Sequence, residues 1–209
     1  MTRGHAPAQI THGIHALLSQ PWIYRFVQWL FHHSPTDRAL KAWTGDCTGK
    51  TVLDVGCGPG EGIHQFSGAR YIGFDLSPDY IAHAQTHHGR RGEFFCSSVD
   101  NLDVERLPVI DLVLMQGVLH HLSDRQIGDF FQRIAPRLSQ GACVITIDPT
   151  YREGQSRLAR WLVGQDRGKN VKTVDDYRAV SARYFAHVEA ISITQCFPPY
   201  DRCLQRLQA

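Results

Sequence analysis

Three glycines at alternate positions, Gly56, Gly58 and Gly60, follow directly on the apolar run Thr51–Val55. Glycine adopts backbone angles that a side chain forbids, and it lets a ligand approach the main chain closely. We therefore expect this loop to hold a nucleotide-like ligand over the end of a strand, near the start of the next helix. The spacing GxGxG differs from GxGxxG and from GxxxxGK followed by Ser or Thr, which disfavours dinucleotide and nucleoside-triphosphate sites.

Carboxylates occur where neighbouring strands are predicted to end. Asp75 closes the second predicted strand, 15 residues after Gly60, and its two oxygens suit the two hydroxyls of a ribose. Asp100 follows the third strand, where it can accept a hydrogen bond from an exocyclic amine of adenine or can cap a turn. Asp54 lies inside the first strand, and its carboxylate either orients the glycine loop or contacts a ligand ammonium group.

Two histidines, His120 and His121, follow the fourth predicted strand. An imidazole has a pKa suited to removing a proton near pH 7, so either ring could serve as a general base. Packing around a pocket is the alternative, since the pairs at 32–33 and 87–88 show that adjacent histidines are common in this chain. Cys57 lies within the glycine loop, but the sequence offers no partnered base for a reactive thiol.

The elements that must position these residues alternate between short apolar runs and helical patterns from Lys50 onward. Strands separated by helices at this pace predict a parallel sheet that is covered on both faces. Strands are predicted at 51–55, 70–74, 93–97, 110–115 and 142–147, and two final strands at 187–194 and 203–207. Helices are predicted at 60–66, 77–88, 123–138, 155–163 and 175–184.

Two further segments complete the predicted organisation. Residues 1–45 show helical periodicity between Ile14 and Phe31 and a further helix at 37–43, and we expect this N-terminal helical segment to act as a lid. Residues 46–209 form the main domain, with an insertion at about 151–174 that carries several arginines. These arginines either bind an anionic acceptor or form a solvated helix face.

The composition excludes several classes of protein. Of the 209 residues 43% are hydrophobic and 20% are charged, and the net charge is +2 with neutral histidine, a weak field that disfavours nucleic acid as a partner. No apolar run approaches the ~20 residues of a membrane span. The six cysteines form no CxxC pair and no zinc-finger spacing, so no metal site is expected. The first residues lack an apolar signal core, and we predict a cytoplasmic location.

The chain resembles the class I, Rossmann-like S-adenosylmethionine-dependent methyltransferases of the small-molecule type. The resemblance rests on four motifs that occur in this order: VLDVGCGPG, FDLSP, SSVDNL and DLVLMQGVLHHL. The resemblance covers about residues 50–149, roughly half of the chain. It implies an α/β fold: a doubly wound, mostly parallel seven-stranded sheet with helices on both faces and a reversed final hairpin. The ordered set of motifs is more specific than any one of them.

The resemblance also implies roles for individual residues. The glycine loop would cradle the methionine part of S-adenosylmethionine, Asp75 would bind the ribose, and Asp100 with its neighbours would hold adenine. Residues after the fourth strand would contact the methionine or sulfonium region. The implied cofactor-binding residues are Asp54, Gly56, Cys57, Gly58, Gly60, Asp75, Leu76, Val99, Asp100, Asn101, Gln116 and Gly117.

The resulting functional expectation is methyl transfer to a small-molecule acceptor, with oxygen favoured over nitrogen or carbon. The sulfonium makes the methyl group electrophilic, and orientation alone can lower such a barrier by ~7–11 kcal/mol. A hydroxyl acceptor also needs a base, for which His121 is the first choice and His120 the second. The acceptor and the oligomeric state stay open.

Three alternatives compete with this expectation, and the sequence disfavours two of them. A methyltransferase for RNA or protein is disfavoured because Gln116-Gly-Val-Leu-His120 stands where base-modifying relatives often carry an NPPY-type motif, and Pro198-Pro199-Tyr200 comes far later in the chain. A protein that binds S-adenosylmethionine without transferring its methyl group fits the same motifs. A nicotinamide dehydrogenase is disfavoured by the glycine spacing.

Overall fold

The structure is a computed structural model that describes residues 35–166 and 168–208. The helical periodicity predicted between residues 14 and 31 lies outside the described residues. Of the predicted N-terminal segment, the described part is the helix α3 (Pro35–Thr44) and the turn that follows it.

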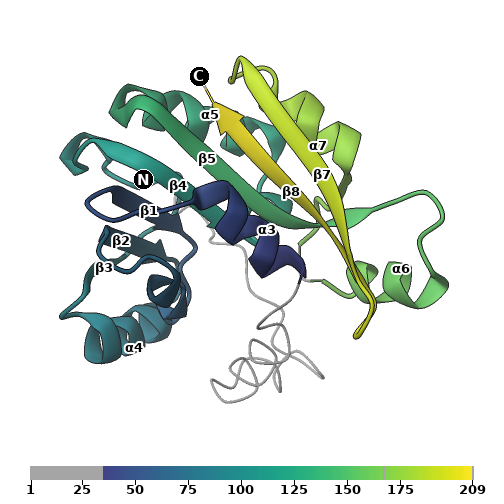
Figure 1. The fold of residues 1–209 in the computed structure, drawn as a ribbon, viewed down its shortest axis with the longest axis horizontal. Coiled ribbons are helices and arrows are strands. Elements are labelled where there is room, and N and C mark those ends of the chain that lie inside the picture. The colour runs from purple at the N-terminus through teal and green to yellow at the C-terminus, as the bar shows by residue number, and fades with distance from the viewer. Residues whose placement is uncertain (1–34, 167, 209) are drawn as a thin grey trace, which may run out of the picture.

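A central sheet dominates the fold (Figure 1). Its main path runs β3-β2-β1-β4-β5-β8-β7, and β6 pairs with β5 off this path. The pairs among β1 to β5 are parallel, whereas β8 is antiparallel to both β5 and β7. The strands are β1 (Thr51–Val55), β2 (Arg70–Asp75), β3 (Gly92–Cys96), β4 (Ile110–Gln116), β5 (Leu138–Tyr151), β6 (Lys172–Thr173), β7 (His187–Gln195) and β8 (Tyr200–Gln208). The prediction of a mostly parallel sheet that ends in a reversed hairpin is confirmed, but the sheet has eight strands and not the expected seven, because the short β6 also pairs with β5.

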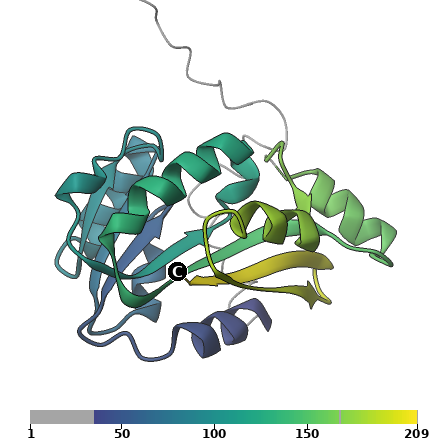
Figure 2. The same cartoon turned by 90° about the horizontal axis from the view of Figure 1, so that it is seen from above.

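Helices cover both faces of this sheet (Figure 2). On one face α3 and α4 pack against the strands, and on the other face α5 and α7 do so, while α6 contacts β5 and β8. The helices that follow α3 are α4 (Pro78–His88), α5 (Asp124–Ile134), α6 (Arg157–Gly164) and α7 (Val174–Ser181). Short 3₁₀ helices occupy Glu61–Gln65, Val104–Arg106, Leu119–His121 and Ala135–Arg137.

Polar side chains fix where the longer helices begin. The Ser77 hydroxyl accepts a hydrogen bond from the Tyr80 amide at the start of α4, where Pro78 supplies a preset φ. Ser123 and Gln126 form a reciprocal capping box at the start of α5. Each cap follows a strand or its connecting loop, so the sequence marks the turn from sheet to helix locally.

Three predicted boundaries were wrong. The helix predicted from Gly60 to Phe66 is a single 3₁₀ stretch, and α5 ends at Ile134 because Pro136 lacks the amide that would continue the helix. The strand β5 is also far longer than its apolar centre at 142–147. It extends because β4 pairs with it along one side and β8 along the other.

The core forms two layers, one on each side of the sheet. Side chains alternate between these layers along each central strand. In β1, Val52 belongs to the layer under α3 and α4, and Leu53 belongs to the layer under α5 and α7. Leu112 and Val113 of β4 divide in the same way. Because β1 and β4 are buried on both faces, their carboxyl ends are held rigidly.

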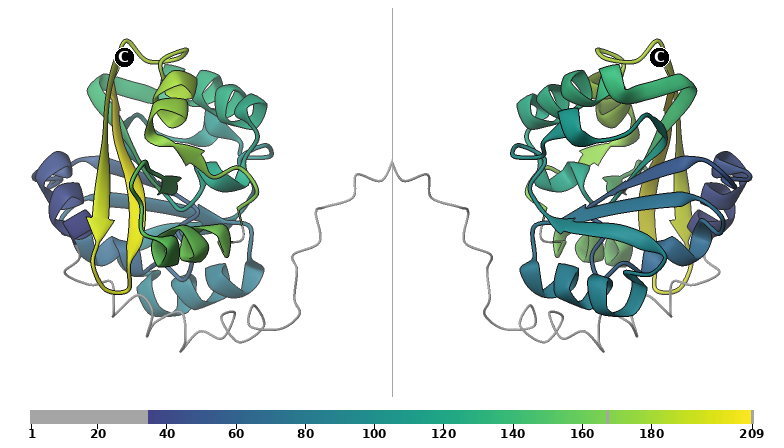
Figure 3. Two further views of the ribbon diagram at one scale, coloured as in Figure 1. Left: turned by 90° about the vertical axis from the view of Figure 1, so that its right-hand side faces the viewer. Right: turned by 90° about the vertical axis from the view of Figure 1, so that its left-hand side faces the viewer.

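The hairpin of β7 and β8 closes one edge of the sheet (Figure 3, left, in yellow). The helix α3 packs against both of these strands, and the Arg202 guanidinium lies 3.4 Å from the Thr36 hydroxyl. Because Arg202 pairs with Pro149 of β5, the start of α3 lies at the edge of the sheet where the parallel strands end.

We expect Phe131→Ala to lower the free energy of unfolding by about 3–5 kcal/mol, because it removes an aromatic ring from the layer under α5. The Phe131 ring is buried and packs edge-to-face on Phe185, with ring centroids 5.0 Å apart. Arg125→Ala, on the exposed side of the same helix, is the matched control and should change the value by no more than ~0.5 kcal/mol. Urea unfolding of both variants tests this, and equal midpoints would contradict it.

Candidate functional site

The predicted site residues gather at the point where the order of the parallel strands reverses. The strand β1 has β2 on one side and β4 on the other, so the chain crosses over the sheet in opposite directions from this point. In the register, Val55 lies opposite Phe74 of β2 and Met115 of β4. Open parallel sheets bind ligands in the crevice beyond the strand ends at such a point.

The glycine loop adopts the conformation that its composition predicts. Gly56, Gly58 and Gly60 have φ angles of 72°, 54° and 86°, in the left-handed region that disfavours side chains. A Cβ on Gly56 would lie 2.7 Å from Cγ2 of Val118, and a Cβ on Gly60 would lie 2.9 Å from Cβ of Ala84. Glycine is therefore required both by the backbone and by the closeness of the neighbours.

The loop is tied to the end of β2 through its backbone. The amides of Gly56 and Cys57 both donate to the Phe74 carbonyl, at 2.8 and 3.0 Å. The Cys57 side chain is buried, and burial raises the pKa of its thiol. An uncharged, enclosed thiol fits the packing role of Cys57 and not a nucleophilic one.

Asp75 lies at the end of β2 and organises the same turn. Its Oδ2 accepts from the Gly58 amide at 3.0 Å, and its Oδ1 accepts from the Ser77 amide at 2.9 Å. A carboxylate offers about four lone-pair positions, so each oxygen keeps capacity for a further donor. The adjacent Leu76 side chain is 67% exposed, which leaves an apolar surface beside the carboxylate.

Asp54 lies beneath the loop. Its carboxylate is buried and accepts a hydrogen bond from the Tyr71 hydroxyl. A Cβ on Gly62 would lie 2.8 Å from Asp54 Oδ2, so the carboxylate packs closely against the turn that follows the loop. Burial raises the pKa of Asp54 to about 7. Of the two predicted roles, these contacts favour the one in which Asp54 supports the loop.

The loop after β3 presents Asp100 and Asn101 to solvent, with Val99 buried beside them. Gln126 of α5 donates to Asp100 Oδ2 at 2.9 Å. Arg133 of α5 donates to the carbonyls of Val99 and Asp100 at 2.9 and 3.0 Å. The helix α5 thus fixes the backbone of this loop, a support that the sequence did not reveal.

The end of β4 brings in the last predicted contacts. Gln116 is exposed, and Gly117 has a φ of 70° and donates its amide to the Ile147 carbonyl of β5 at 2.7 Å. The chain then turns into the 3₁₀ helix that carries His120 and His121. The predicted site residues therefore lie at the carboxyl ends of β1, β2 and β4 or on the loops that follow the strands at this edge of the sheet.

His120 is held between two carboxylates. Its Nδ1 lies 2.8 Å from Asp148 Oδ1, and its Nε2 lies 2.8 Å from Asp166 Oδ1. Burial lowers the pKa of His120, but the hydrogen bonds and charges of Asp148 and Asp166 outweigh this effect and raise the pKa to about 9. Near neutral pH the ring is therefore an imidazolium with both nitrogens engaged, whereas the neighbouring His121 is exposed.

The clamp around His120 links the insertion to the sheet. Burial raises the pKa of the Asp166 carboxyl, but the hydrogen bond and charge of His120 and the hydroxyl of Tyr200, at 2.7 Å, hold it well below its usual range. The Asn170 amide also donates to the His120 carbonyl at 3.0 Å. Asp148 comes directly after the predicted strand at 142–147, so its position at a strand end could have drawn attention, but no spacing indicated Asp166 or Tyr200.

The described helices include none that is long and apolar enough to cross a bilayer.

Comparison with known proteins identifies the type of domain. A family model described as a methyltransferase domain matches residues 52–141. Over 81 residues the chain is 36% identical to the malonyl-(acyl-carrier protein) O-methyltransferase of Hahella chejuensis, a match that covers 35% of this chain and 28% of that protein. The chain thus spans little more than a quarter of this relative.

Solved structures share the fold over most of the chain. The magnesium protoporphyrin IX methyltransferase of Synechocystis PCC 6803, solved with bound S-adenosylhomocysteine, superimposes with a TM-score of 0.62 at 19% identity, over 85% of this chain and 84% of that one. The mitomycin 7-O-methyltransferase MmcR gives 0.62 at 18% identity, over 94% and 71%. Residues 52–141 of the chain therefore form a methyltransferase domain, and the sheet around them has the class I, Rossmann-like methyltransferase fold.

Proposed function

We propose that the protein binds S-adenosylmethionine at the carboxyl edge of its sheet and transfers the methyl group to a small-molecule acceptor. The observation that carries this proposal is the joining of the glycine loop to Asp75 through the Gly58 amide, beside the exposed loop of Asp100. Both features lie within the segment that matches the methyltransferase domain. The glycine cradle, which a side chain would fill, suits a cofactor that touches the main chain.

The cofactor is assigned to residues on three neighbouring loops. In this assignment the glycine loop holds the methionine part, Asp75 accepts from the ribose hydroxyls, and Leu76 packs against the nucleoside. Asp100 and Asn101 face the adenine amine, and Val99 forms the apolar wall behind it. Gln116 and Gly117 contact the methionine or sulfonium region, and Asp54 and Cys57 support the loop from below.

The bound sulfonium would supply an electrophilic methyl group, and the chain has to align an acceptor with it. We assign the acceptor to the space next to Gln116 and His121. The insertion at about 151–174 would form a lid over it. Oxygen is the proposed acceptor atom, because His121 is an exposed imidazole near the cofactor edge. The O-methyltransferase names of two of the proteins compared above agree with this choice.

His120 is assigned a positioning role and not that of the base. Neither ring nitrogen is free to take a proton while Asp148 and Asp166 are hydrogen-bonded to it. Its imidazolium instead bridges Asp166 of the insertion and Asp148 of β5, and so holds the insertion against the end of β5. The wall of the acceptor space would therefore be fixed by a buried charge pair.

Asp75→Ala should weaken S-adenosylhomocysteine binding about 10- to 100-fold, because it removes charge-assisted hydrogen bonds to the ribose and frees the Gly58 amide. Asp79→Ala is the matched control, since Asp79 is an exposed carboxylate in the first turn of α4. Calorimetric titration of both variants checks the assignment. Equal affinities in the wild type and Asp75→Ala would contradict it.

His121→Ala should lower turnover of a hydroxyl acceptor about 10²- to 10⁴-fold while leaving S-adenosylhomocysteine affinity unchanged, because only proton removal is lost. The assay is the formation of S-adenosylhomocysteine across a panel of small phenols and alcohols. Thr86→Ala, an exposed change on α4, serves as the control for handling and folding. If the His121 variant kept full turnover, His121 would not be the general base.

The clamp also predicts how stability depends on pH. The folded pKa of His120 is raised from 6.5 to about 9, so its contribution to stability is complete below pH 6.5 and is lost as the pH rises through 9. The loss amounts to roughly 3 kcal/mol. In Asp166→Asn the pKa of His120 falls, and the decrease in stability between pH 6 and pH 9.5 should be smaller.

Urea unfolding at these two pH values measures that difference. Asp129→Asn, an exposed change on α5, is the control and should keep the wild-type dependence. If wild type and Asp166→Asn lost stability equally over this interval, the clamp would not be the source of the pH dependence.

A further inference from the structure

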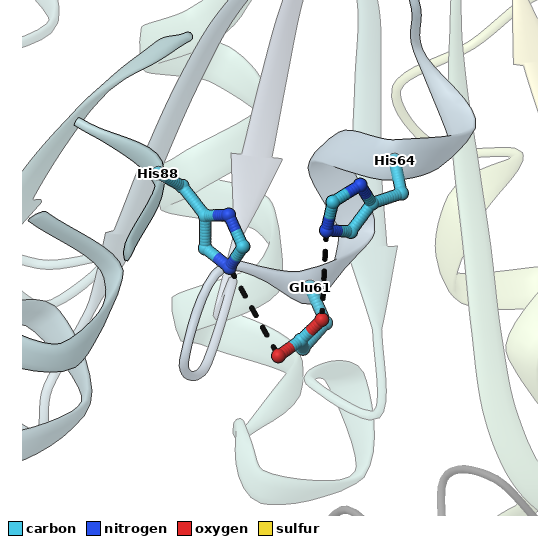
Figure 4. A group of neighbouring side chains, drawn as sticks. All are labelled: Glu61, His64 and His88. Carbon is cyan, nitrogen blue, oxygen red and sulfur yellow. Dashed lines mark ion pairs between the residues drawn. The ribbon is translucent and has the colours of Figure 1, made fainter. Parts of the chain in front are cut away.

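A second group of titratable side chains lies beside the glycine loop, outside the clamp and outside the proposed cofactor contacts. Glu61 and His64 lie on the 3₁₀ helix that follows Gly60, and His88 is the last residue of α4 (Figure 4). The three side chains point toward one another (Figure 4). Glu61 Oε2 lies 3.7 Å from His64 Nε2, and Glu61 Oε1 lies 3.9 Å from His88 Nε2.

His88 Nε2 is the unusual member of this group. The His88 side chain is only 9% exposed, and the atom Nε2 is buried without a hydrogen-bond partner among the described residues. Buried polar atoms in folded proteins nearly always have a partner, so an orphan requires an explanation. Figure 4 shows this nitrogen directed at the Glu61 carboxylate, across a gap too wide for a hydrogen bond.

We propose that Glu61, His64 and His88 bind one divalent transition-metal ion of the zinc class. One ligand atom from each residue lies within 4.8 Å of the others. Two imidazoles and one carboxylate suit zinc, whereas magnesium and calcium prefer oxygen ligands alone. Three protein ligands leave a fourth tetrahedral position for water.

Closing the site needs side-chain movement. Ligand atoms of a tetrahedral zinc ion with bonds of about 2.1 Å lie roughly 3.4 Å apart. The two imidazole nitrogens lie 3.7 and 3.9 Å from different oxygens of Glu61, and one ligand atom from each residue lies within 4.8 Å of the others, so the ligand atoms must draw together by up to about 1.4 Å. His64 and Glu61 are 53% and 33% exposed at their side chains and can move toward the buried His88.

Arg91 forms a hydrogen bond with His64 Nδ1, the ring nitrogen that faces away from Glu61. Its guanidinium lies 3.1 Å from His64 Nδ1, and because arginine only donates, Nδ1 accepts and the ring proton of neutral His64 resides on Nε2. Coordination through Nε2 requires that proton to move to Nδ1, and Arg91 must then withdraw. Arg91 is exposed, so its movement into solvent is sterically free. Arg91 therefore weakens metal binding, and its removal should strengthen it.

The ion would join two elements that flank the glycine loop. A Cβ on Gly60 would lie 3.2 Å from His88 Cδ2, so the ring of His88 already packs against the loop. Bridging His88 to Glu61 and His64 would fasten the end of α4 to the turn that follows the loop. The proposal uses no residue assigned to the cofactor or the acceptor, and it stands independently of methyl transfer.

A neighbouring histidine pair provides one rival site, and His120, His121 and Asp166 form another group with ligand atoms within 4.8 Å of one another. His83 and His87 lie one turn apart on α4, with their rings stacked at 3.9 Å between centroids. Their Nδ1 atoms lie 3.3 Å from the Pro59 carbonyl and 2.9 Å from the His83 carbonyl respectively. Such a pair can supply two ligands without a carboxylate, so a variant of His87 separates the two sites.

The test is a zinc titration of the chain, purified without a histidine tag and stripped with a chelator, read by calorimetry and by the thermal unfolding midpoint. Wild type should bind one Zn²⁺ per chain and unfold at a higher temperature with zinc. His64→Gln and Glu61→Gln should each weaken binding more than about 100-fold, beyond the loss seen for outer-sphere partners. Both are at least partly exposed, so folding should survive them.

Two further variants decide the assignment. His87→Gln should bind zinc as wild type does, and Arg91→Ala should bind it several-fold more tightly, because His64 Nδ1 is then free to carry the proton. Equal zinc affinity in wild type and His64→Gln, or loss of binding in His87→Gln, would overturn the proposal. So would weaker binding in Arg91→Ala.

Discussion

The backbone of one turn, held against the end of a neighbouring strand, decides the geometry of the whole sheet edge. The Phe74 carbonyl accepts from the amides of Gly56 and Cys57, and the Asp75 carboxylate accepts from the amide of Gly58. These bonds fix a loop in which three glycines have positive φ angles and, having no side chains, leave the main chain bare. Because Asp75 also holds the turn into α4, one carboxylate couples the loop to the helix that packs behind it. The proposed contacts of the methionine part and of the ribose depend on this arrangement.

Charge is distributed unevenly around this edge. Asp54 lies beneath the loop, and burial raises its pKa to about 7, so it carries little charge in mildly acidic solution. On the other side of β4, His120 is positively charged between Asp148 and Asp166. Both ring nitrogens of His120 are hydrogen-bonded to these carboxylates, and this trio of charges holds the insertion in place. Removing one partner would leave a buried charge uncompensated, at its full desolvation cost. Structural rigidity and sensitivity to substitution thus have the same origin.

Local patterns were sufficient to predict most of the fold, because glycine, caps and apolar alternation act over a few residues. The strand Thr51–Val55, the glycine loop and Asp75 at a strand end could all be predicted in this way. The length of β5 could not, because it depends on pairing with β8, more than fifty residues away. The clamp of His120 was missed for the same reason: Asp166 reaches it only through the path of the insertion. The cluster around His88 likewise joins two elements that no spacing rule connects.

The place of β8 between β5 and β7 constrains the order of assembly. Residues 187–195 cannot join the sheet directly after they are made, because the strand that separates them from β5 comes later in the chain. Either the hairpin forms first and docks as a unit along Val144 to Pro149, or β8 pairs with β5 and β7 then adds to β8. Until β8 pairs with it, β5 presents a row of unpaired backbone amides and carbonyls flanked by apolar side chains. Intermediates of this chain should therefore be most prone to self-association through β5, and segments that bind this edge would delay maturation.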